Sequence, residues 1–123
     1  MRRALAALTL VLTAGALVAC GSSESGGGSD GGTSTEPKVI SVTISGDTVT
    51  PNGERVEVAV GQPITLHVEA DAPGEIHVHS SPEQELEYDK GMTMLELTPI
   101  STPGTVDVES HSLDKVIVQL EVS

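Results

Sequence analysis

The sequence has almost no aromatic residues: it contains no Phe and no Trp, and Tyr88 is its single Tyr. Val, Ile and Leu must therefore fill the core, and branched aliphatic side chains pack well on pleated strands. Cys20 is the only cysteine, so no disulfide can form within the chain. The longest uncharged apolar run, Ala4 to Ala19, falls short of the roughly 20 residues that a transmembrane helix needs.

Basic residues are also scarce. Six Lys and Arg stand against 18 Asp and Glu, which gives a net charge of −12. Nucleic acid and anionic membrane surfaces are poor partners for such a chain, because its own field repels them. Cations and basic proteins are the partners that this charge favours.

The motifs of the common hydrolases and nucleotide-binding enzymes are missing. The chain has no G-x-S-x-G, no H-E-x-x-H and no phosphate-binding loop. Serines do follow His79 and His111, but neighbouring residues on a strand point to opposite faces. We therefore expect a protein that is not an enzyme.

The first 19 residues have the layout of an export signal. Arg2 and Arg3 precede an apolar run that ends in small residues. The sequence Leu-Val-Ala-Cys-Gly at 17–21 resembles the lipobox of bacterial lipoproteins, in which the cysteine becomes the first, lipidated residue of the mature chain. This resemblance implies a signal peptide at 1–19, acyl chains such as palmitate on Cys20, and a location on the extracytoplasmic face of the cell membrane. Two or more acyl chains anchor a protein stably.

A linker and one domain follow the signal peptide. Residues 20–37 consist mostly of Gly, Ser, Thr and acidic residues, a composition that cannot build a core. Residues 38–123 form the predicted domain. Arg2 and Arg3 leave with the signal peptide, so four basic residues then face 18 acidic ones, a net charge of −14.

Residues 38–123 alternate apolar and polar side chains with a period of two, which is typical of strands. Turn residues such as Pro51-Asn52-Gly53 and Pro103-Gly104 separate the apolar runs. About seven short strands are expected, and they favour an antiparallel β-sandwich. The runs contain Val39–Ile44, Val56–Val60, Ile64–Val68, Ile76–Val78, Leu95–Leu97, Val106–Val108 and Val116–Val122.

The order of these segments resembles the cupredoxin-like domains. The resemblance is carried by VEVAVGQPITLHVEADAPGEIHVHS at 56–80, KGMTMLELTPISTPGTVDVESH at 90–111, and the valine-rich end. A blue copper site needs a thiolate with two imidazoles and usually a thioether. The resemblance places Ser110 at the cysteine position and Leu113, Asp114 and Lys115 where further ligands belong. We therefore expect a cupredoxin-like domain without blue-copper electron transfer.

Histidines remain as candidate ligands. His77 and His79 lie two residues apart, so both project from one face of a strand, with β-carbons about 6.5–7 Å apart. The resemblance puts His111 near them, and we predict a metal site of His77, His79 and His111 for copper or zinc. Met92 and Met94 share a face and are further candidate ligands, since thioethers favour Cu(I).

Simpler interpretations stay open for the same residues. The histidines are compatible with an ordinary solvated face, and His67 is expected to point outward beside Thr65 and Glu69. The acidic run from Glu83 to Asp89 is interpreted as a solvated loop, because it lacks the pattern of a calcium loop. The alternative function is a metal-free module that presents an acidic face to a protein partner at the cell envelope.

Overall fold

The structure is a computed structural model, and it describes residues 36–123. The predicted signal peptide, the lipidation site Cys20 and nearly all of the predicted linker lie outside the described residues. Between residues 36 and 123, no helix is long and apolar enough to cross a membrane.

The described chain is built of strands, in agreement with the all-β prediction. Nine strands are present rather than about seven, because two short segments, Thr48–Thr50 and Gln84–Tyr88, also pair. The strands are β1 (Lys38–Ser45), β2 (Thr48–Thr50), β3 (Glu54–Val58), β4 (Ile64–Ala70), β5 (Gly74–Val78), β6 (Gln84–Tyr88), β7 (Gly91–Leu97), β8 (Gly104–Ser110) and β9 (Lys115–Val122).

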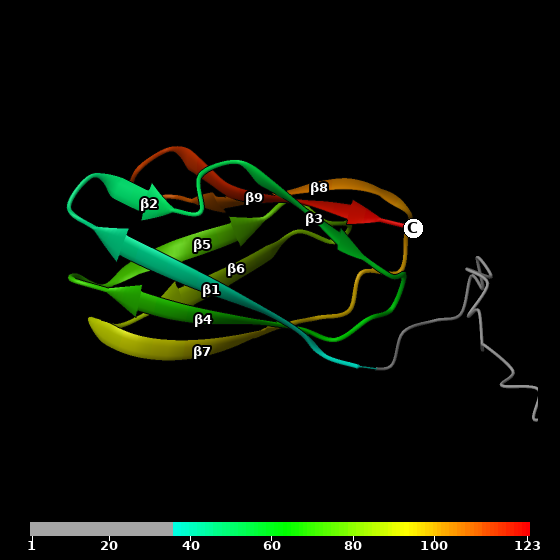
Figure 1. Cartoon of the computed structure of the whole chain (residues 1–123), viewed down its shortest axis with the longest axis horizontal. Helices are drawn as coiled ribbons and strands as arrows, with labels where there is room; N and C mark the ends of the chain where they lie inside the picture. Colours follow the sequence, from blue (N-terminus) through cyan, green and yellow to red (C-terminus); the bar gives the residue numbers. More distant parts are fainter. Residues whose placement is uncertain (1–35) are drawn as a thin grey trace, which may run out of the picture. The chain divides into compact units, whose positions relative to one another are not determined.

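These strands form two sheets that pack face to face (Figure 1). The four-stranded sheet has the order β2-β1-β4-β7, and the five-stranded sheet has the order β3-β9-β8-β5-β6. The predicted sandwich is confirmed, but both sheets are mixed: β1 pairs with β4, and β3 with β9, in parallel. The predicted antiparallel direction holds for the other five strand pairs but not for these two, because side-chain alternation carries no information about strand direction.

The core lies between the sheets and consists almost wholly of branched aliphatic side chains. Most strands bury every second residue, as in β4, where Ile64, Leu66 and Val68 are buried and the residues between them are more exposed. Strand β9 departs from this pattern, since the consecutive residues Ile117 and Val118 are both buried beside an irregularity in its pairing with β8. Leu66, Ile76, Ile117 and Leu120 are the largest side chains among those that are fully enclosed. The alternation read from the sequence therefore selected the correct inward face.

The single tyrosine closes one end of this core. Tyr88 on β6 is 4% exposed and lies opposite Gly74 in the β5–β6 pair. A Cβ atom at Gly74 would lie 2.3 Å from the Tyr88 Oη and 2.6 Å from its Cζ. Only glycine leaves room for the ring at this place.

The five-stranded sheet turns an acidic face outward. Strand β5 runs between β6 and β8, so its outward side chains meet those of both neighbours. His77 lies opposite Glu85 of β6 and Glu109 of β8. This register sets the surroundings of the histidines that the sequence singled out.

Candidate functional site

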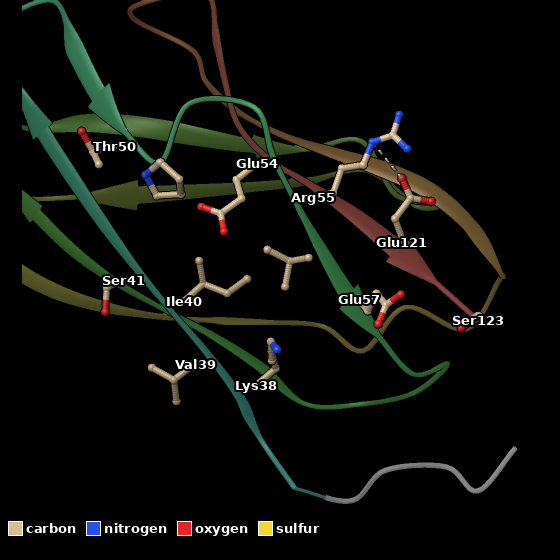
Figure 2. Close-up of a pocket in the computed structure, with 12 residues that line it drawn as sticks. Lys38, Val39, Ile40, Ser41, Thr50, Glu54, Arg55, Glu57, Glu121 and Ser123 are labelled. Atoms are coloured by element: carbon tan, nitrogen blue, oxygen red, sulfur yellow. Dashed lines mark ion pairs between the residues drawn. The ribbon is translucent and has the colours of Figure 1, made fainter. Parts of the chain in front are cut away.

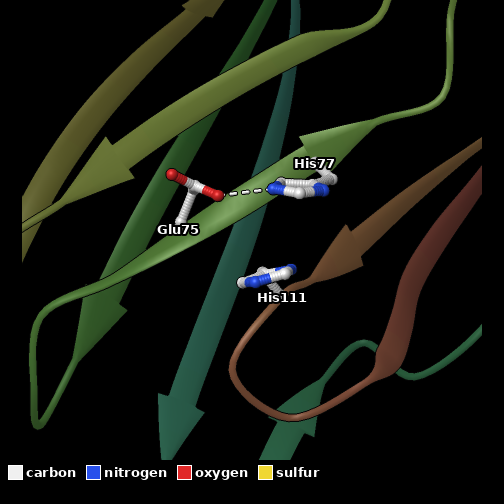
Figure 3. A group of neighbouring side chains, drawn as sticks. All are labelled: Glu75, His77 and His111. Atoms are coloured by element: carbon white, nitrogen blue, oxygen red, sulfur yellow. Dashed lines mark hydrogen bonds and ion pairs between the residues drawn. The ribbon is translucent and has the colours of Figure 1, made fainter.

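Glu75, His77 and His111 form the tightest group of potential metal ligands among the described residues (Figure 3). One ligand atom from each side chain lies within 4.8 Å of the others. Glu75 and His77 are two residues apart on β5 and therefore project from the same face. His111 follows the last residue of β8, and its backbone N–H donates a hydrogen bond to the Glu75 carbonyl at 3.0 Å.

The rings of His77 and His111 are stacked. Their centroids are 4.4 Å apart and their planes differ by 19°. The His77 Nε2 also forms a short hydrogen bond with a Glu75 carboxylate oxygen. Two imidazoles and a carboxylate thus meet on a half-exposed patch, beside a surface hollow of about 800 Å³ that Glu75 and His111 help to line.

Further carboxylates surround His77. Glu83 Oε1 lies 3.8 Å from its Nδ1, and Glu85 Oε1 lies 3.9 Å from its Nε2. The pKa of His77 is raised above 6.5, first by the hydrogen bond with Glu75 and then by the charges of Glu75, Glu85 and Glu83, against a lowering by desolvation. The negative field that favours a proton here favours a metal cation as well.

His79 lies beside this group rather than within it. Its ring is 6.4 Å from that of His77 between centroids, and its Nε2 is 2.8 Å from a Glu109 oxygen. Its Nδ1 lies 3.6 Å from Glu83. Of the three predicted histidines, His77 and His111 lie together in the structure. The third potential ligand within 4.8 Å of both is Glu75 and not His79.

Sequence reasoning missed Glu75 and misread the acidic run. Glu75 shares the parity of His77 and His79, so the same alternation could have revealed it. The segment interpreted as a loop is mostly strand β6, where Glu85 and Glu87 point outward while Leu86 and Tyr88 point inward. The alternation of Glu with Leu86 and Tyr88 indicated a strand. The high density of acidic residues instead suggested a loop.

Met92 and Met94 do not lie with His77 and His111. They lie on β7, an edge strand of the four-stranded sheet, whereas His77 lies in the five-stranded sheet. They share an outward face while Leu95 and Leu97 are buried, as the sequence predicted. A single site that combines both residue sets is therefore not present among residues 36–123.

A second surface feature is a groove of about 1030 Å³ between β1 and β3 (Figure 2). Its charged lining is mixed, with Lys38 and Arg55 near Glu54 and Glu57. An ion pair of 3.8 Å joins Arg55 and Glu121 at one side. The groove contains no histidine and lies apart from the Glu75 group.

No family model and no curated protein matches this chain. Solved structures do match it. An oxidised methionine-to-leucine variant of amicyanin is 18% identical, with a TM-score of 0.50 over 68% of this chain and 81% of that one. A purple cupredoxin from Nitrosopumilus maritimus is 16% identical over 68% of this chain and 98% of that one, with a TM-score of 0.45. A multicopper oxidase is 16% identical over 70% of this chain and 44% of that one, with a TM-score of 0.49.

The domain has a cupredoxin-like fold. At 18% identity the amicyanin likeness establishes the fold alone. What the cupredoxin-like domain binds depends on its own side chains.

The residues present do not fit a blue copper centre. Ser110 is fully buried, and its Oγ has no hydrogen-bond partner among the described residues. Its side chain points into the core, whereas the ring of the next residue, His111, stacks on His77 at the outer face. The inward position and the two imidazoles therefore lie on opposite sides of one sheet.

This geometry predicts the outcome of restoring the cysteine. A Ser110→Cys variant loaded with Cu(II) is expected to lack the intense visible absorption of a blue copper protein, because its thiol cannot share an ion with the outward imidazoles. Visible absorption spectroscopy checks this, with Ser110→Ala as the control for tolerance of the substitution. An intense thiolate-to-copper band in the cysteine variant would contradict the placement of these side chains.

The His77 environment predicts a raised titration midpoint. In an NMR pH titration, His77 should titrate above 6.5, and Glu75→Gln should lower its pKa by removing the main partner of the protonated ring. Stability from this pair is present in full below pH 6.5 and is lost as pH rises through the folded-state pKa. Glu57→Gln removes one charge from β3 as a control and should leave the His77 midpoint in place. A midpoint at or below 6.5 in the parent chain would refute the prediction.

Proposed function

We propose that this protein is a membrane-anchored, extracytoplasmic lipoprotein whose cupredoxin-like domain binds a divalent transition-metal ion, copper or zinc, without blue-copper redox activity. The observation that carries the metal proposal is the convergence of Glu75, His77 and His111 within 4.8 Å. Two imidazoles and a carboxylate form a donor set that suits Zn(II) and Cu(II). The cupredoxin-like fold makes copper the first metal to test.

The arrangement of the site supports reversible binding more than structural use of a metal. His77 and Glu75 are part-buried, and His111 is exposed, so an ion can enter and leave from the solvent side. The aliphatic core is complete without a metal, since no ligand of the group contributes to it. Holding and releasing a cation at the cell envelope is the role that fits these features.

The surrounding charge supports the same function. Glu83, Glu85 and Glu109 lie within reach of the His77 and His79 rings and add negative charge around the proposed ion. Such a field raises the local concentration of cations and speeds their capture. The same acidic face would attract a basic protein if no metal binds, and that is the alternative function.

Calorimetric titration of the detergent-solubilised full chain with Zn(II) and Cu(II) tests the metal site. We expect one equivalent with a Kd of about 1 μM or tighter, lost in His77→Ala/His111→Ala. Glu75→Gln should weaken binding by roughly 10- to 100-fold, since it removes one ligand and the partner of another. Affinity should fall as pH decreases, because protons compete for the imidazoles, and the fall should begin above pH 6.5 because the pKa of His77 is raised.

His79→Ala is the matched control for this titration. It removes an imidazole of the same face that lies outside the three-ligand group, so one equivalent should still bind. Absence of binding to the parent chain in both metals would reject the metal proposal. Salt-dependent binding of a basic envelope protein would then support the alternative.

Cys20 is proposed as the lipid anchor, and cell fractionation tests it. In cells that export the protein, the parent chain should sediment with membranes and incorporate labelled palmitate, whereas Cys20→Ala should do neither. The reason is that Cys20 is the only thiol of the sequence, so the alanine variant has no side chain that can carry the proposed lipid. Membrane association of Cys20→Ala equal to that of the parent would argue against lipid anchoring.

A further inference from the structure

Met92 and Met94 are large apolar side chains that the alternation of strand β7 turns outward. Their exposed fractions are 64% and 65%, while Leu95 and Leu97 of the same strand are buried. Among the described residues, Val39 is the only other large apolar side chain that is comparably exposed. Most other aliphatic side chains of the domain are buried. The thioethers of Met92 and Met94 are instead exposed to solvent on the same strand.

The structure adds an imidazole to these thioethers. His67 on β4 pairs directly with Met94 on β7, and Glu69 pairs with Met92. Directly paired residues of antiparallel strands have β-carbons about 4.5–5.5 Å apart, and diagonal neighbours lie about 7–8 Å apart. His67 is therefore adjacent to one methionine and diagonal to the other, on the outer face of the four-stranded sheet.

Side-chain flexibility allows the donor atoms to converge. The β-carbons of Met92 and Met94 lie about 6.5–7 Å apart along the strand. Each methionine has three rotatable bonds, so the two Sδ atoms can approach one ion together with a nitrogen of His67. Both methionines are more than half exposed, so an ion can reach this face from the solvent.

The donor set is soft, unlike that of the Glu75 group. Thioethers select Cu(I), whereas imidazole with carboxylate suits Zn(II) and Cu(II). We infer that Met92, Met94 and His67 form a separate binding site for a soft monovalent cation, Cu(I), with Glu69 supplying nearby negative charge. This site lies in the other sheet from Glu75, His77 and His111, and it does not depend on them.

Two sites of different softness would let one domain hold copper in either oxidation state. The cupric ion would occupy the imidazole and carboxylate group on the five-stranded sheet, and the cuprous ion would occupy the thioether site on the four-stranded sheet. Neither site needs to exchange electrons with the other. The thioether site is inferred from its own residues and stands even if the Glu75 group binds no metal.

The test uses the full chain with Cys20→Ser in detergent, which removes the anchor sulfur. Cu(I) is titrated anaerobically against a chromophoric cuprous chelator, and Ag(I) serves as a redox-inert probe in NMR spectra of the methionine methyl groups. We expect one equivalent of Cu(I), sulfur scattering in the copper X-ray absorption spectrum, and shifts of the Met92 and Met94 methyl signals with Ag(I). The chain is produced with residues 1–19 retained, so that Met1, the remaining methionine of the sequence, is the internal reference.

Matched variants separate this site from the proposed divalent site. Met92→Leu/Met94→Leu keeps apolar side chains of similar volume and should abolish Cu(I) binding and sulfur scattering while Zn(II) binding persists. His67→Gln should weaken Cu(I) binding by at least about 10- to 100-fold, the loss typical of residues that only hydrogen-bond a metal ligand. His77→Ala/His111→Ala should retain the Cu(I) equivalent. Unchanged Cu(I) affinity in the double leucine variant, or loss of Cu(I) in His77→Ala/His111→Ala, would overturn the inference.

Discussion

The structure depends on the alternation of inward and outward side chains along its strands. The core that they enclose contains a single aromatic ring, that of Tyr88. Each strand must send its Val, Ile and Leu side chains inward, because nothing else in the sequence can fill the space between the sheets. The residues between them are then forced outward, whatever their chemistry. This is why Glu75, His77 and their acidic neighbours gather on one outer face, and why Met92 and Met94 are exposed on another.

The same constraint separates this domain from a blue copper protein that has the same fold. An inward residue at the end of β8, Ser110, and an outward residue immediately after it, His111, cannot serve one ion. The inward place is occupied by a buried hydroxyl in an aliphatic interior. The candidate ligands that remain are at the surface, where Glu75 and His77 are part-buried and His111 is exposed.

Charge explains why one outer face is the better candidate for a divalent ion. The five-stranded sheet concentrates carboxylates around His77, and hydrogen bonding with Glu75 raises the pKa of that histidine. The outer face of the four-stranded sheet instead pairs thioethers with a single imidazole at His67. Among residues 36–123, the two thioethers lie on one outer face and the group of Glu75, His77 and His111 lies on the other, and this difference is the basis for proposing different ions for the two faces.

The sequence by itself determined the all-β class, the inward set of aliphatic residues and the shared face of His77 and His79, because all three follow from local alternation along one strand. It also contained the lipobox-like segment around Cys20, a local motif. Only the tertiary structure decided which strands lie side by side, because pairing depends on contacts between distant segments. That pairing brought His111 onto His77, made Glu75 the third member of the group and placed His67 beside Met94. Two strand pairs are parallel, and most of the acidic run forms strand β6 beside β5. Side-chain alternation predicts neither the direction of a strand nor its partner.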